Sequence, residues 1–131
     1  MKKTLEVVGA IIIKDGYVFC AKRGKNKSLA YKWEFPGGKI EKDETHEEAL
    51  KREIKEELNS EINVKSFFMK ITYEYDTFII NLYTYLCELK SGLLEISEHI
   101  EKKWVKKEEL LSLDFTPADL PIVEELSYHL L

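Results

Sequence analysis

The sequence predicts one α/β domain in which helices cover a mixed β-sheet. Strand-like runs come first, a helix follows, and further strands and a second helix complete the chain, an order that is typical of a mixed sheet with packed helices. A length of 131 residues is sufficient for one domain with its own hydrophobic core. Because 44% of the residues are hydrophobic and 34% are charged, the composition is that of a globular protein and not of a disordered or fibrous one.

Two strands and a turn are predicted at the N-terminus. Residues 5–13 form the continuous, β-branched run LEVVGAIII, which is typical of a strand that is buried on both faces. The turn signal KDG occupies residues 14–16, and residues 17–23, YVFCAKR, complete a hairpin. A polar loop follows over residues 24–32, and we expect the Pro-Gly-Gly of residues 36–38 to break the chain.

The central part of the chain predicts one helix that is capped by Thr45 and ends near Leu58. Thr45 and Glu48 have the spacing of a capping box, in which each side chain accepts a hydrogen bond from the other residue's backbone N–H. The helix carries an apolar stripe that should face the core, formed by Leu50, Ile54 and Leu58. Asn59 follows, and Asn is second only to Gly in tolerating the left-handed conformation at a helix end.

The second half of the chain predicts a long hairpin and a terminal helix. Residues 62–75 and 77–89 are rich in aromatic and β-branched side chains, so they are predicted as two long strands joined by a tight turn at Asp76. The terminal helix is expected to begin with Thr116 as its cap and Pro117 at its first helical position.

Charge, cysteine content and hydropathy limit the partners and the location of the protein. The net charge is −4 without a long block of like charge, which argues against polymeric nucleic acid as a partner. Cys20 and Cys87 lie among apolar neighbours and are expected to be buried free thiols in a reducing compartment. No run approaches the roughly 20 apolar residues of a membrane span, and the N-terminal residues lack the features of a signal peptide. We therefore expect a cytoplasmic protein that does not bind membranes.

An acidic cluster on the predicted central helix is the first functional signal. Glu53, Glu56 and Glu57 share one arc of the helix, away from the apolar stripe. A like-charge pair one turn apart, such as Glu53 and Glu57, costs roughly 0.2–0.5 kcal/mol even when it is exposed. A hard divalent cation such as Mg²⁺ or Mn²⁺ removes this penalty, because it binds oxygen ligands. Taken alone, however, the triplet is better explained as part of a charged surface helix.

The sequence around the triplet makes a metal site the better explanation. Gly38 is followed by five residues and Glu44, and then by seven residues and the run REIKEE that begins at Arg52. This spacing resembles the Nudix box, the signature of Nudix hydrolases, at every fixed position from Gly38 to the end of that run. Two later positions differ, because Asn59 replaces a glycine and Ser60 replaces an aliphatic residue. The stretches WEFPGGKIE and TPADLPIVEEL are similar to the MutT-type branch of the family, including its CTP pyrophosphohydrolase subgroup.

The resemblance implies a fold and a metal-dependent activity. Nudix hydrolases fold as an α/β/α sandwich around a mixed sheet, and MutT-type members convert nucleoside triphosphates to nucleoside monophosphates and pyrophosphate. By the resemblance, Mg²⁺, with Mn²⁺ as a substitute, is bound by the carboxylates of Glu53, Glu56, Glu57 and Glu98 and by the carbonyl of Gly37. Glu53 or Glu98 would accept the proton of the attacking water, and Arg52 would assist catalysis by holding Glu44 or a metal-binding carboxylate in place.

Further residues are candidates for contacts with the nucleotide. Arg23 and Lys39 can contact phosphates, and Gly38 allows close approach of the backbone. Phe35 and Phe78 could stack on a base, although core packing explains either residue better when it is taken alone.

Asp119 is the candidate for base selection. MutT-type members that destroy oxidised guanine nucleotides often carry Asn at this place, whereas Asp resembles the CTP pyrophosphohydrolase subgroup. An ionised Asp only accepts hydrogen bonds, so it favours the exocyclic amine of cytosine, in CTP, dCTP or 5-modified cytidine nucleotides. A buried, protonated Asp could donate, so 8-oxo-dGTP stays an alternative substrate. A non-catalytic nucleotide-binding regulator is a further alternative, and the chain could be a monomer or a homodimer.

Overall fold

The computed structural model describes residues 1–129 of the chain. Its elements, in order, are β1 (Lys3–Lys14), β2 (Tyr17–Lys22), β3 (Trp33–Glu34), β4 (Gly37–Lys39), α1 (His46–Leu58), β5 (Glu61–Glu74), β6 (Phe78–Ser91), β7 (Glu101–Lys106), the 3-10 helix η1 (Lys107–Ser112) and α2 (Leu120–Leu126). In this part of the chain, no helix has the length and the apolar composition that crossing a membrane requires.

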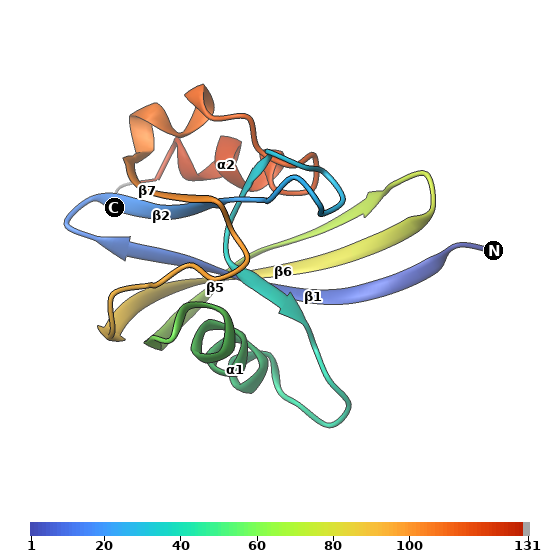
Figure 1. The fold of residues 1–131 in the computed structure, drawn as a ribbon, viewed down its shortest axis with the longest axis horizontal. Helices are drawn as coiled ribbons and strands as arrows, with labels where there is room; N and C mark the ends of the chain where they lie inside the picture. The colour runs from blue at the N-terminus through green and yellow to red at the C-terminus, as the bar shows by residue number, and fades with distance from the viewer. Residues whose placement is uncertain (130–131) are drawn as a thin grey trace.

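A mixed β-sheet forms the centre of the molecule, as the sequence predicts. Its strand order is β3-β2-β1-β6-β5, with β4 paired to β1 and β7 paired to β2. The pair β1–β6 is parallel and the other pairs are antiparallel. Figure 1 shows α1 on one side of the strands and α2 with η1 on the other, so the expected α/β/α arrangement is confirmed.

Two hydrophobic clusters hold these layers together, one under each helix. The cluster under α1 contains the predicted apolar stripe, and Leu50, Ile54 and Leu58 are completely buried there. The cluster on the α2 side combines residues of β1, β2, β3, β6, β7, η1 and α2, with Val123 and Leu126 among its members. Cys20 and Cys87 are buried free cysteines, as predicted.

Helix α1 begins and ends as the sequence predicts. The Thr45 hydroxyl accepts a hydrogen bond from the Glu48 N–H at 3.1 Å, and the Glu48 carboxylate accepts one from the Thr45 N–H at 2.9 Å. Asn59 adopts the left-handed conformation with φ 47° and ψ 44°, and its N–H donates to the Lys55 carbonyl. These caps satisfy backbone groups that a helix leaves unpaired at its two ends.

The expected chain break at residues 36–38 is confirmed only at Pro36, a bend between β3 and β4, because Gly37–Lys39 forms strand β4. Gly37 and Gly38 pair with Gly9 and Val8 of β1. A Cβ atom on Gly37 would collide with the Val8 carbonyl oxygen, so the strands approach too closely for any residue other than glycine. The glycine pair therefore brings the start of the Nudix-like segment against β1.

The predicted start of the terminal helix is also wrong. Helix α2 begins at Leu120, with Asp119 as its N-cap, and the segment before it is a turn. Pro121 has no N–H and cannot donate to the carbonyl of Pro117, so the regular helical pattern cannot extend back to Pro117. Thr116 instead closes the turn, since its carbonyl accepts hydrogen bonds from the N–H groups of Asp119 and Leu120.

Candidate active site

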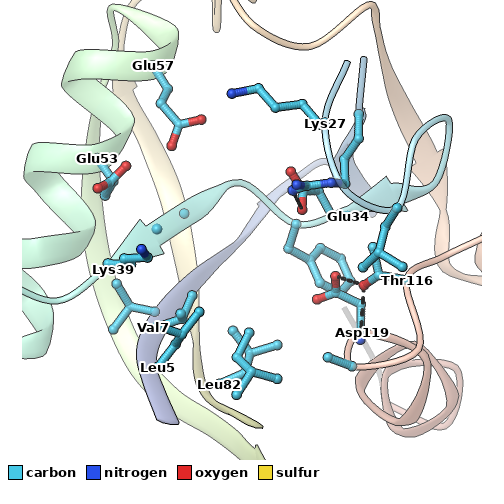
Figure 2. Close-up of a pocket in the computed structure, with 18 of the residues that line it drawn as sticks. Leu5, Val7, Lys27, Glu34, Lys39, Glu53, Glu57, Leu82, Thr116 and Asp119 are labelled. Carbon is cyan, nitrogen blue, oxygen red and sulfur yellow. Dashed lines mark hydrogen bonds and ion pairs between the residues drawn. The ribbon is translucent and has the colours of Figure 1, made fainter. Parts of the chain in front are cut away.

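A cavity of about 780 Å³ lies between α1, the central strands and the segment before α2. Figure 2 shows its two ends: Glu53 and Glu57 project from α1 on one side, and Thr116 and Asp119 lie on the other. Every residue with a predicted site role contributes to the cavity lining, namely Arg23, Phe35, Gly37, Gly38, Lys39, Arg52, Glu53, Glu56, Glu57, Phe78, Glu98 and Asp119. The geometry thus brings together side chains that lie far apart in the sequence.

The acidic end of the cavity combines α1 with β4. The carboxylate of Glu53 packs directly on Gly38, where an added Cβ would lie 2.6 Å from Glu53 Oε1. Burial raises the pKa of Glu57 to about 9, and a hydrogen bond with Glu53 and the negative charges of Glu53, Glu34 and Glu98 contribute to the shift. The raised pKa indicates that negative charges are crowded at this wall, an unfavourable arrangement that a bound cation would relieve.

Positive side chains partly satisfy these carboxylates. Within residues 1–129, no group of three or more acidic, His or Cys side chains converges closely enough to hold a metal ion as the side chains stand. Glu98 lies at the rim of the cavity and forms an ion pair with Lys27 at 3.4 Å. Glu53 is held by Arg52 at 2.9 Å. The carboxylate oxygens at this end of the cavity are of the kind that Mg²⁺ and Mn²⁺ prefer as ligands.

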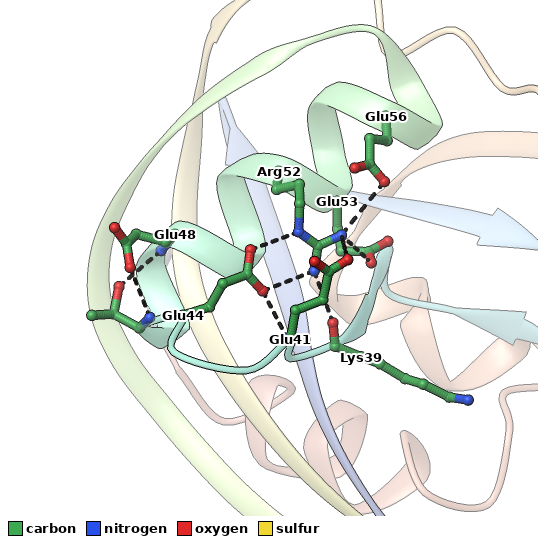
Figure 3. Close-up of polar contacts among 8 residues, drawn as sticks. Lys39, Glu41, Glu44, Glu48, Arg52, Glu53 and Glu56 are labelled. Atoms are coloured by element: carbon green, nitrogen blue, oxygen red, sulfur yellow. Dashed lines mark hydrogen bonds and ion pairs between the residues drawn. The ribbon is translucent and has the colours of Figure 1, made fainter.

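Arg52 organises the carboxylates of the acidic wall (Figure 3). Its Nε and Nη2 donate to the two oxygens of Glu44 at 2.6 and 2.9 Å, and Nη2 also donates to the Lys39 carbonyl at 2.9 Å. Its Nη1 donates to Glu53 at 2.9 Å and to Glu56 at 3.4 Å. The hydrogen bonds from Arg52 hold the pKa of Glu44 at about 2. Glu44 is therefore an anchor for Arg52, and Arg52 in turn orients Glu53.

A second charged group, centred on Glu34, was not predicted. Glu34 accepts a hydrogen bond from Arg23 at 2.9 Å and lies 2.9 Å from Nε2 of His99 through its other oxygen. Arg23 also donates to the Ser28 carbonyl at 2.7 Å, so it fixes the loop that follows β2. The charge of Arg23 is consequently balanced by Glu34, whereas the exposed side chain of Lys39 forms no ion pair with the residues that the structure describes.

The opposite end of the cavity is aromatic and apolar apart from one buried acid. Phe35 is almost fully buried and packs on Phe115, with 5.4 Å between ring centroids, whereas Phe78 is half-buried and stacks on Tyr75 at 4.8 Å. Asp119 is only 6% exposed. Its Oδ2 is 2.5 Å from the Thr116 hydroxyl. Burial, and secondly the charge of Glu34, raise the pKa of Asp119 to about 8, although Thr116 and Arg23 oppose the shift.

Comparison with known proteins identifies the family. The NUDIX domain family matches residues 7–125 of the chain. This chain belongs to the Nudix hydrolases. It is 38% identical to the CTP pyrophosphohydrolase of Escherichia coli K12 over 122 residues, which cover 93% of this chain and 90% of the relative. It is 36% identical to the 8-oxo-dGTP diphosphatase of the same organism over 126 residues, or 96% of this chain and 98% of the relative.

Comparison with solved structures also places the chain among the Nudix hydrolases. The solution structure of the MutT protein from methicillin-resistant Staphylococcus aureus 252 is 43% identical, with a TM-score of 0.79 over 97% of this chain and 98% of that one. The E. coli ORF135 protein is 38% identical, with a TM-score of 0.80 over 94% and 88% of the two chains. This Nudix hydrolase is therefore an enzyme that acts on nucleotides as a pyrophosphohydrolase, and Nudix hydrolases generally use divalent metals.

The two departures of this Nudix hydrolase from the family signature are accommodated locally. Asn59 adopts the conformation for which the family uses glycine. Ser60 is buried, and its hydroxyl donates to the Leu58 carbonyl at 2.9 Å and accepts from the Leu94 N–H at 2.8 Å. Because both hydrogen-bonding functions of the hydroxyl are satisfied, burial of a polar side chain at this aliphatic position carries little penalty.

Proposed function

We propose that this Nudix hydrolase is a Mg²⁺-dependent nucleoside triphosphate pyrophosphohydrolase that prefers cytidine nucleotides. The substrates would be CTP, dCTP or their 5-methyl or 5-hydroxy derivatives, and the products a nucleoside monophosphate and pyrophosphate. The two-ended cavity supports this proposal, because a triphosphate needs cations beside the acidic end and a base needs an apolar end with few, specific polar groups. Mn²⁺ could replace Mg²⁺, since both prefer oxygen ligands.

The position of Asp119 is the observation that carries the choice of base. Its Oδ2 is engaged by the Thr116 hydroxyl, so Oδ1 is the oxygen left for a ligand. When Asp119 is ionised, Oδ1 accepts hydrogen bonds. When Asp119 is neutral with its proton on Oδ2, that proton points to Thr116 and Oδ1 is a carbonyl oxygen, which also accepts. Both states favour an exocyclic amine, which cytosine offers, over a carbonyl.

The residues at the acidic end have separate proposed tasks. Glu53, Glu56, Glu57 and Glu98, with the carbonyl of Gly37, would hold the cation, which when bound supplies charge neutralisation at the phosphates and acidifies a water molecule. Glu53 and Glu98 are the two candidates for accepting the proton of the attacking water. Arg52 keeps Glu53 oriented through its bonds to Glu44 and the Lys39 backbone. Lys39 would contact the phosphates, while Arg23 would act as part of the group centred on Glu34.

An 8-oxo-dGTP diphosphatase is the second candidate function. Relatives of that description are 32–36% identical to this chain. The raised pKa of Asp119, about 8, also supports it, because a neutral acid with its proton on Oδ1 could donate to the carbonyl of an oxidised purine.

A substrate panel tests the proposal. Release of pyrophosphate and of the monophosphate is measured for CTP, dCTP, 5-methyl-dCTP, UTP, ATP, dGTP and 8-oxo-dGTP, with Mg²⁺ and with EDTA. We expect the largest kcat/KM for a cytidine nucleotide and no turnover in EDTA. The variant Asp119→Asn should move the preference toward 8-oxo-dGTP. A wild-type enzyme that favours 8-oxo-dGTP over every cytidine nucleotide would select the second candidate.

A further inference from the structure

Tyr75 connects the start of β6 with the segment before α2 at the end of the cavity that is proposed to bind the base. No role in binding a metal or a phosphate is proposed for it. It lies directly after β5, at the tip of the β5–β6 hairpin, where its N–H donates to the Phe78 carbonyl at 2.8 Å. Its own carbonyl accepts a hydrogen bond from the Lys2 side chain at 2.9 Å, which fixes the hairpin tip to the N-terminal segment. The backbone of Tyr75 is therefore anchored on both sides.

The hydroxyl of Tyr75 reaches the segment that carries Asp119. It accepts a hydrogen bond from the Ala118 N–H at 3.1 Å. Burial raises the pKa of Tyr75, so the hydroxyl stays protonated at neutral pH and accepts this bond as a neutral group. A backbone N–H in the turn between Thr116 and Asp119 is thus tied to a hairpin that is 43 residues away in the sequence.

The ring of Tyr75 also supports the aromatic wall of the cavity. It stacks on Phe78 with 4.8 Å between ring centroids and 27° between ring planes. Phe78, Ala118 and Asp119 all line the cavity beside Tyr75. One side chain consequently sets both the orientation of Phe78 and the position of the residue that precedes Asp119.

We propose that Tyr75 is a specificity-determining positioning residue, whose hydroxyl holds Asp119 at a fixed distance from Phe78 so that only a base with a correctly placed amine fits. This inference rests on the proposed function. A base that stacks against Phe78 would present its exocyclic amine to Oδ1 of Asp119 only while the turn keeps its place. If the turn can shift, the carboxyl no longer discriminates between the amine of cytosine and the carbonyl that uracil carries at the same ring position.

The variant Tyr75→Phe tests this role, because it keeps the ring and removes only the hydroxyl. We expect KM for CTP to rise roughly three- to tenfold, the equivalent of one neutral hydrogen bond, while kcat stays within about twofold of the wild type. The ratio of kcat/KM for CTP to that for UTP should fall by a similar factor. A merely structural defect would lower kcat and the melting temperature instead, and would leave that ratio unchanged.

Tyr73→Phe is the matched control. Its ring lies 4.6 Å from that of Tyr75, its side chain is more exposed, and its hydroxyl forms no hydrogen bond with the residues that the structure describes. The inference is overturned if Tyr75→Phe and Tyr73→Phe give the same CTP to UTP ratio. It is equally overturned if only kcat changes. Should the wild type prefer 8-oxo-dGTP, the proposed cytidine preference fails by itself, and comparing the two variants on 8-oxo-dGTP and dGTP still decides the role of Tyr75.

Discussion

Replacing Asp119 with asparagine removes a buried ionisable group and keeps its shape, so its effect on stability follows from the structure. In the folded protein the pKa of Asp119 is raised from 3.8 to about 8, first by burial and then by the charge of Glu34. The folded state therefore binds a proton that the unfolded state releases between these two values. The sign follows directly: the wild type loses stability as the pH rises from 3.8 toward 8, because folding must keep this carboxyl neutral or bury its charge.

The size of this loss can be calculated for neutral pH. At pH 7 the solution lies 3.2 pH units above the ordinary pKa of 3.8, and each unit corresponds to about 1.36 kcal/mol, which gives a cost of up to ~4 kcal/mol. The asparagine side chain would carry no such cost, since it is neutral in both the folded and the unfolded state at every pH. We expect Asp119→Asn to be more stable than the wild type by up to ~4 kcal/mol at pH 7, and equally stable near pH 3.5.

Urea unfolding followed by tryptophan fluorescence measures this difference. Free energies of unfolding are compared at pH 3.5, 5, 6 and 7, in EDTA and without nucleotide. Glu57 contributes equally to both proteins, so its own raised pKa cancels in the difference. The control is Asp76→Asn, which makes the same charge change at an exposed position in the β5–β6 turn. A difference between Asp119→Asn and the wild type that does not change with pH would show that folding leaves the pKa of this carboxyl unshifted, and the reasoning about its burial would be refuted.

Three further substitutions test the acidic end of the cavity. Glu57→Gln should fold with an undiminished melting temperature, because its charged form is already disfavoured in the folded state, and should lose roughly 100-fold or more in Mg²⁺-dependent kcat; turnover close to the wild-type rate would remove Glu57 from the metal ligands. Arg52→Lys keeps the charge but cannot form the two bonds to Glu44, so urea unfolding should show a loss of about 1–3 kcal/mol together with a lower kcat. Gly38→Ala places a Cβ against the Glu53 carboxylate, so the apparent KM for Mg²⁺ should rise about tenfold. Gly9→Ala, whose Cβ would meet only side-chain atoms at 3.4 Å, should leave that KM unchanged.

Local signals explain which parts of the fold could be predicted. The capping box at Thr45 and the stripe through Leu50, Ile54 and Leu58 act within one helix, so the sequence alone places α1. Strand β4 could not be predicted this way, because Gly37 and Gly38 become a strand only when β1 approaches them. The start of α2 at Leu120 has a local cause: Pro121 has no N–H and cannot form a helical hydrogen bond to Pro117.

The contrast between signals within one segment and contacts that form only on folding also explains which site residues could be predicted. The glutamates of α1 and Arg52 follow a spacing within one segment, and the cavity collects all of them. Glu34, His99, Thr116 and Tyr75 carry no such signal. Glu34 and His99 are 65 residues apart and meet only because β3 and the loop before β7 both end beside β2. Glu34 stands inside the stretch WEFPGG that suggested the family, but only the folded chain shows that it holds Arg23.

Ser60 and Gly92 show how a departure from a family signature can be compensated by a residue far away in the sequence. The polar Ser60 occupies an aliphatic position and forms its hydrogen bonds with Leu58 and Leu94. The chain can bring the Leu94 N–H to that hydroxyl only if the backbone at Gly92 passes directly over Ser60, where an added Cβ would lie 2.8 Å from Ser60 Cα. Gly92 also has φ +100°, a conformation that side chains disfavour. Ser60 and Gly92 therefore depend on each other, and helix α1 ends beside this pair while its three glutamates keep their places in the family signature.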